Sequence, residues 1–306
     1  MWAIQALTYL AVLVFVVFVA RRAAKYANAP MHLRWELYPV AHEVGKDYGG
    51  SFMEEMDWWT KPRHTSSFNM VKAMATEILL VKTLWEHNRK LWLVSYPFHG
   101  GIYVVIGFLA LMVLGALLQI FGWKITAAAD WWLVALHWLT LAAGVVGMAS
   151  VTLGCLGLLA RRTFDDDLRR YSTPSDYFNL LFILSISAIG LYAWAFVDPT
   201  FGQLRSYIAG LLTLNPAALH PVLATLVVLL SAFLMYLPFT HMTHFVGKFF
   251  SYHNVRWDDT PNVFSAANQR ALGDALVKPI SWSAPHIGGD KAGRKWVDAV
   301  TQEGDK

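Results

Sequence analysis

Two histidines stand at the ends of uncharged, membrane-length stretches of this chain. His99 lies in the segment Pro-Phe-His-Gly-Gly at 97–101, and His244 ends the segment Pro-Phe-Thr-His-Met-Thr-His at 238–244. Ligating side chains are costly to place at membrane depth, so their presence there indicates function. Two histidines on facing helices can supply both axial ligands of a haem iron. The chemistry that this pattern predicts is electron transfer through a membrane-bound haem.

Three more histidines are candidates for the same chemistry. His241, three residues before His244, is an alternative ligand or a contact for a haem propionate. His137 lies near the outer end of the third helix and His220 begins the fifth helix at the outer side, so the two are expected to share a membrane level. They are candidates for a second haem site or for binding and deprotonating a quinol. A histidine that merely begins a helix at the interface is the plainer interpretation of His220.

Arginines and glycines near these positions have two interpretations each. Arg161 and Arg162 are expected to anchor the inner membrane face, and they are also candidates for contacts with haem propionates. Gly100 and Gly101 would let a porphyrin edge approach the backbone beside His99. Four glycines of the third helix favour close helix packing, with clearance for a flat macrocycle as the alternative: Gly144, Gly147, Gly154 and Gly157.

The elements that must hold these residues are transmembrane helices. Apolar residues make up 56% of the 306-residue chain and charged residues only 15%. Runs of 18 or more apolar residues are typical of spanning helices. Five runs qualify: residues 1–20, the intervals Lys90–Lys124, Asp130–Arg161 and Asp176–Asp198, and the part of 206–247 from about His220 to Lys248. The single Cys155 excludes intramolecular disulfides and any metal site made of cysteines alone.

The positive charges predict the orientation of these helices. Arg21, Arg22 and Lys25 follow the first apolar run, which indicates a retained anchor rather than a cleaved signal peptide. With the N-terminus outside, the outer loops hold only Lys124 and Arg205, and the other 23 of the 25 basic residues lie inside. The net charge of +4 therefore reflects retention at the inner face and does not indicate nucleic-acid binding.

Two inner segments are longer than a connection requires. In the loop 21–95, residues 66–90 lack Pro and Gly and predict an amphipathic helix that lies on the membrane or a partner. The polar tail 251–306 is expected to dock a soluble inner subunit, with a self-contained cap under the bundle as the alternative. The expected domains are the first helix at 1–20, this loop, a four-helix haem-binding core at 96–250 and the tail.

These motifs in this order resemble the gamma subunit of respiratory nitrate reductase. The resemblance covers about residues 95–250 and rests on four motifs: Phe-His-x-Gly at 98–101, Leu-Leu-Ala-Arg-Arg at 158–162, Thr-Pro-Ser-Asp-Tyr at 173–177 and Pro-Phe-x-x-x-x-His at 238–244. The apolar runs and the charges predict an all-α integral membrane protein, a bundle of five transmembrane helices with a long inner N-terminal loop and an inner C-terminal tail, and the resemblance agrees with this fold. The resemblance also implies a dihaem cytochrome b that oxidises quinol and passes electrons to an inner iron–sulfur subunit.

Two further segments resemble one branch of that family. Met-His-Leu-Arg-Trp-Glu-Leu-Tyr-Pro at 31–39 and Ile-Ser-Trp-Ser-Ala-Pro-His-Ile at 280–287 are similar to the gamma-like cytochromes of the DsrM, TmcC and HmcE type. That branch implies anaerobic respiration with menaquinone in a bacterial inner membrane. The partner that it implies is a cytoplasmic heterodisulfide reductase-like iron–sulfur subunit, in some complexes with a periplasmic multihaem cytochrome c.

Carried over residue by residue, the resemblance assigns His99 and His244 as ligands of the inner haem. The outer haem ligands do not carry over, because Leu109 and Leu226 stand at their positions. The chain is therefore expected to hold one haem b, or two if His137 and His220 rebuild the second site.

The function expected is that of an electron-transfer subunit in a quinone-linked oxidoreductase complex. The alternative is a haem-poor membrane anchor that recruits the soluble subunit. Buried charges and broken-helix repeats, which are typical of transporters, are not evident in the apolar runs.

Overall fold

The computed structural model describes residues 2–28, 40–44, 51–62, 64–250, 265–281 and 293–301. It divides the chain into two compact units, one made of Met1–Ala29 and Phe68–Phe249 and the other of Pro30–Ser67 and Phe250–Lys306. The motif at 31–39 and most of the motif at 280–287 lie outside the described residues. Each unit is treated by itself below.

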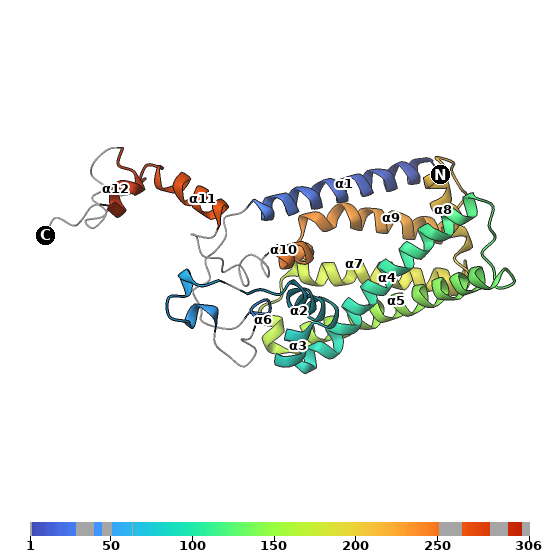
Figure 1. Cartoon of the computed structure of the whole chain (residues 1–306). Coiled ribbons are helices and arrows are strands. Elements are labelled where there is room, and N and C mark those ends of the chain that lie inside the picture. Colours follow the sequence, from blue (N-terminus) through green and yellow to red (C-terminus); the bar gives the residue numbers. More distant parts are fainter. Residues whose placement is uncertain are drawn as a thin grey trace. The chain divides into compact units, whose positions relative to one another are not determined.

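The first unit is a bundle of long apolar helices, as the sequence predicts. Five of its helices are long and apolar enough to cross a membrane, and they lie side by side in Figure 1. They are α1 (Trp2–Ala27), α4 (Arg89–Ile120), α5 (Trp131–Phe164), α7 (Pro174–Phe196) and α9 (Pro221–Tyr236), the last extended by a 3-10 turn to Phe239.

The order of packing is α4 on α5, α5 on α7, α7 on α9 and α9 on α1. Glycines bring α4 and α5 into backbone contact. A Cβ atom built on Gly154 would lie 2.5 Å from the backbone nitrogen of Phe98, and one on Gly101 would lie 2.7 Å from that of Val151. Gly144, Gly147 and Gly157 also face α4 or Phe201 at less than ordinary contact distance. The glycines of the third helix therefore serve close packing.

Local sequence explains where α7 and α9 begin. Thr173 and Asp176 form a capping box at the start of α7, with Pro174 in the first turn. His220 is the N-cap of α9, with Pro221 in the first turn. Both starts are where the sequence predicts them.

Two helices expected to be continuous are broken. The helix expected over 66–90 is interrupted at Val81, whose φ of 51° is left-handed, and forms α2 (Ser67–Leu80) and α3 (Lys82–His87). The fifth helix ends near Pro238 and continues as the 3-10 turns η3 (Leu237–Phe239) and η4 (His241–Thr243). A separate short helix, α10 (His244–Phe250), follows. The extended backbone of Thr240 between the turns prevents a single helix to Lys248.

The two ends of the bundle carry different short elements. At one end, α8 (Gly202–Leu212) packs on α4, and the hydroxyl of Tyr9 in α1 donates to Leu211 O at 2.6 Å. At the other end lie α2, α3, α6 (Asp166–Arg170) and α10 (Figure 1). We call these the α8 end and the α10 end.

The second unit contains short helices and two isolated bridges. Its helices are η1 (Phe52–Glu54), η2 (Trp58–Thr60), α11 (Ala266–Leu276) and α12 (Trp296–Thr301). Bridges join Glu43 to Thr65 and Pro279 to Lys295.

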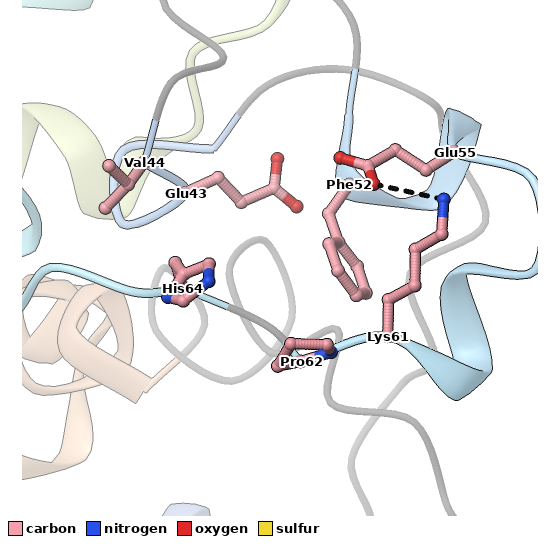
Figure 2. A pocket seen from close by; sticks show the side chains of 7 residues that line it. All are labelled: Glu43, Val44, Phe52, Glu55, Lys61, Pro62 and His64. Atoms are coloured by element: carbon pink, nitrogen blue, oxygen red, sulfur yellow. Dashed lines mark ion pairs between the residues drawn. The ribbon is translucent and has the colours of Figure 1, made fainter.

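A cavity of about 270 Å³ in this unit has mixed charge, and its Glu55 and Lys61 form an ion pair at 3.6 Å (Figure 2). None of the predicted site residues lines it; the lining residues are Glu43, Val44, Phe52, Glu55, Lys61, Pro62 and His64.

Candidate functional site

His99 is held by the turn of α4 that precedes it. Its Nδ1 lies 2.8 Å from Ser95 O and 3.2 Å from Ser95 Oγ, and the Ser95 residue is 7% exposed. A carbonyl oxygen can only accept a hydrogen bond, so Nδ1 carries the proton. The lone pair of the imidazole is then on Nε2, which is the nitrogen left to bind a metal.

His244 has the same arrangement on a different element. It is the first residue of α10, and its Nδ1 lies 3.2 Å from His241 O. By the same reasoning, Nδ1 donates and Nε2 keeps its lone pair. Both imidazoles are thus in the tautomer that a haem ligand requires.

The rings of His99 and His244 face one another. Their centroids are 6.3 Å apart and their planes make an angle of 76°. Metal–imidazole bonds are about 2 Å long, so the ring centroids of two axial ligands on one iron lie about 6 Å apart. Among the described residues no group of three or more His, Cys, Asp or Glu could hold a metal ion. Two protein ligands at this spacing fit a metal whose other ligands come from a macrocycle.

The two glycines after His99 differ in their surroundings. A Cβ atom on Gly100 would meet only the Tyr96 ring, at 4.0 Å, whereas Gly101 is packed against Val151. Gly100 therefore leaves room beside His99, and Gly101 serves the contact between α4 and α5.

The position of α10 is fixed from α1. Arg22 donates to Thr240 O at 2.9 Å and also to the hydroxyl of Thr243, which is 2% exposed. These bonds hold the turn immediately before His244. The sequence interpretation treats Arg22 only as an orientation signal and misses this role.

A buried ion pair beside the two histidines was also missed. Lys248 Nζ donates to Glu77 Oε1 at 2.8 Å, and the Glu77 side chain is 7% exposed. Lys248 lies one helical turn after His244 in α10. The spacing of four residues between His244 and Lys248 can be seen in the sequence. The partner Glu77 cannot be found in this way, because it lies 171 residues from Lys248 in the chain.

His241, Arg161 and Arg162 have other partners. His241 Nε2 lies 3.5 Å from Asp176 Oδ1, at the start of α7. Arg161 pairs with Asp165 at 2.8 Å, and Arg162 donates to Ser172 Oγ at 2.8 Å. These bonds give the arginines a structural role where α5, α6 and α7 meet. Their contact with propionates stays a prediction.

The structure does not bring His137 and His220 together as it does His99 and His244. His220 is exposed, and its Nδ1 accepts from Val222 N at 3.3 Å as the N-cap of α9. His137 is 6% exposed, and its Nδ1 has no hydrogen-bond partner among the described residues. No ring contact between them is present in the described part of the chain, and their helices, α5 and α9, each pack on α7.

The α8 end also contains buried charged residues and an apolar cluster. Arg205, 6% exposed, donates to Ile125 O and Thr200 O at 3.4 and 3.2 Å. Asp198 accepts from Gly202 N at 2.8 Å and Leu204 N at 3.1 Å. Leu109, at the position of the family's outer ligand, packs on the apolar cluster of Phe108, Met112, Met148 and Phe201.

Comparison with known proteins gives one match. A family model described as nitrate reductase gamma subunit matches residues 81–258, which is more than half of the chain. The matched segment begins just before α3 and includes both His99 and His244. No curated protein and no solved structure matches the chain.

Proposed function

The chain belongs to the nitrate reductase gamma subunit family, and from this premise we propose that it binds one haem b between His99 and His244. Membership makes it a membrane cytochrome b subunit of a respiratory redox complex, associated with a soluble redox subunit and with lipid. We further propose that it transfers electrons between menaquinol or menaquinone and an iron–sulfur subunit.

One observation carries this proposal. Two imidazoles from different elements lie with their centroids 6.3 Å apart, and each Nδ1 faces a backbone carbonyl. This arrangement leaves both Nε2 atoms free to bind, as axial haem ligands require.

When bound, haem supplies reversible one-electron chemistry at a potential that its surroundings tune. The chain's own residues fix the ligands. Ser95 O and His241 O orient the two rings, and Gly100 leaves space beside His99. Arg22 keeps the turn before His244 in place.

The quinone is proposed to react near the α10 end. Gly144 of α5 contacts Phe108, which lies about 14 Å along α4 from His99, and His137 lies about 10 Å farther in the same direction along α5. A quinone at His137 would therefore be remote from the ligand pair. A second haem is not required, because Leu109 contributes to apolar packing and His220 caps α9.

The identity of the partner is proposed from the branch resemblance. The DsrM, TmcC and HmcE type implies a heterodisulfide reductase-like iron–sulfur subunit and, in some complexes, a periplasmic multihaem cytochrome c. The positive-inside pattern supports an α10 end that faces the cytoplasm of a bacterial cell, with the N-terminus in the periplasm.

Haem analysis of the purified complex tests the proposal. The amount of haem b per polypeptide is measured as pyridine haemochromogen, and the bis-histidine signal is measured by low-temperature EPR. We expect one haem in the native complex and loss of its bis-histidine signal in both His99→Ala and His244→Ala. His241→Ala is the matched control, because this neighbour is exposed and faces Asp176.

The outcomes separate the alternatives. A full haem content with an unchanged spectrum in both ligand variants would rule out the assignment. Two haems per chain would make His137 and His220 ligands after all. A complex that contains no haem would leave the membrane anchor as the function.

A further inference from the structure

Helix α2 is bonded to both elements that carry the ligand histidines. The hydroxyl of Tyr103, one turn after His99 in α4, donates to Ile78 O of α2 at 2.8 Å. The next residue toward the start of α2, Glu77, accepts from Lys248 of α10 at 2.8 Å. Adjacent residues of one amphipathic helix therefore contact the His99 helix and the His244 helix.

The ion pair within this arrangement is held more firmly than a surface pair. Thr83 donates to Glu77 Oε2 through its backbone N at 2.9 Å and through its hydroxyl at 2.8 Å. Both oxygens of the carboxylate thus have partners. With Glu77 7% exposed and Lys248 37% exposed, the lysine is the more accessible member of a largely buried pair. A charge in such a place is poorly screened by salt.

Lys248 is also the member that lies near the ligands. It is four residues after His244, which places the two side chains on one face of α10, about 6 Å apart between Cβ atoms. A fixed positive charge near a haem iron stabilises the reduced form, because reduction adds one negative charge.

From these contacts we infer that the Glu77–Lys248 pair sets the reduction potential of the haem bound by His99 and His244. Lys248 supplies the charge that acts on the iron, and Glu77 is a positioning residue that holds Lys248 and partly offsets it. This inference rests on the proposed function, since it requires a haem between the two histidines.

Potentiometric titration of the haem b absorbance in the purified complex tests the inference. A unit charge within about 10 Å, acting through an effective dielectric constant of about 20, changes an equilibrium roughly tenfold. We therefore expect Lys248→Gln to lower the midpoint potential by about 59 mV, the equivalent of tenfold for one electron. Glu77→Gln should raise the potential, because it removes the carboxylate charge that partly offsets Lys248.

Two controls separate charge from structure. Lys248→Arg keeps the charge and should stay near the native potential. Lys82→Gln breaks an exposed pair with Glu86 in α3, whose side chains are 58% and 50% exposed, and should leave the potential unchanged. The EPR signal of the bis-histidine haem should persist in all four variants.

Shifts of opposite sign in the Gln variants support the inference. Unchanged potentials, shifts of the same sign, or a Lys248→Arg shift as large as that of Lys248→Gln would overturn it. Loss of haem from the Gln variants alone would assign the pair a structural role and also overturn it. Absence of haem from the native complex would instead refute the proposed function, so the two failures are distinguishable.

Discussion

The two ends of the membrane bundle use the same kind of residue in opposite ways. At the α10 end, His99 and His244 come from different elements, their ring centroids are 6.3 Å apart, and each Nδ1 lies against a backbone carbonyl. At the α8 end, His137 is buried and its Nδ1 has no hydrogen-bond partner among the described residues, and His220 caps its own helix. Histidines at matching membrane levels are therefore insufficient for a site. What distinguishes the α10 end is that a second group fixes each Nδ1 and leaves the other nitrogen to bind.

The largest expected effect tests the comparison directly. In the double variant His137→Ala/His220→Ala we expect the haem b content to remain at one per chain, whereas His99→Ala should reduce it to near zero. The reason is that His99 has the ring of its proposed partner His244 6.3 Å away, whereas no ring contact joins His137 and His220 in the described part of the chain. Pyridine haemochromogen analysis measures both contents, and equal losses from the two ends would refute the distinction.

The contact between α4 and α5 near the α10 end should tolerate a larger side chain less well than a helix position that has no neighbours. Gly154→Leu places a side chain where Cβ alone would lie 2.5 Å from Phe98 N. Backbone cannot move aside as a side chain can, so we expect a loss of about 3 kcal/mol in stability. Thermal unfolding in detergent measures it. Gly107→Ala is the control, because nothing lies within 4 Å of its added Cβ; similar losses in both would show that the contact is unimportant.

At the α8 end, a buried carboxylate should contribute stability but have no effect on the haem. Asp198→Ala removes two hydrogen bonds to the start of α8. We expect a cost of about 2 kcal/mol with unchanged haem content. Asp166→Ala, at an exposed pair with Arg169, should be nearly neutral. Haem loss in the Asp198 variant would mean that the two ends are coupled.

The smallest effect concerns acid stability at the α10 end. Burial raises the pKa of Glu77, but hydrogen bonds from Lys248 and Thr83 outweigh it, so its pKa lies below the ordinary value of 4.5. A lowered pKa stabilises the fold above the unfolded value, and this contribution is lost as pH falls through the folded value. Below pH 4.5 the apparent Tm of the native complex should therefore fall more steeply than that of Glu77→Gln, with a difference of about 2–4 °C. Parallel Tm–pH curves for the two proteins would contradict this.

The sequence predicts the spanning helices well, because their determinants are local. Long apolar runs define five of them, and Thr173 and His220 with the prolines that follow mark two of the starts. Spacing also identifies His99 and His244 as a pair before any geometry is known. These features depend on residues that are neighbours in the chain.

The parts that the sequence does not predict depend on the backbone or on distant residues. Pro238 predicts a kink in the fifth helix. It does not predict that Thr240 adopts an extended conformation and begins the separate turn η4. Val81 adopts a left-handed conformation that a β-branched residue rarely takes, so no rule places a break there. The pairing of Glu77 with Lys248 joins positions 171 residues apart. The different surroundings of Gly100 and Gly101 depend on how α4 meets α5.

The separation of α10 from α9 has a consequence for how the protein matures. Because His244 stands on its own short helix, the five spanning helices can insert and pack while the last ligand is still displaced. Under the proposed function, the haem would enter before α10 docks on Arg22 and Glu77 and would be enclosed by that docking.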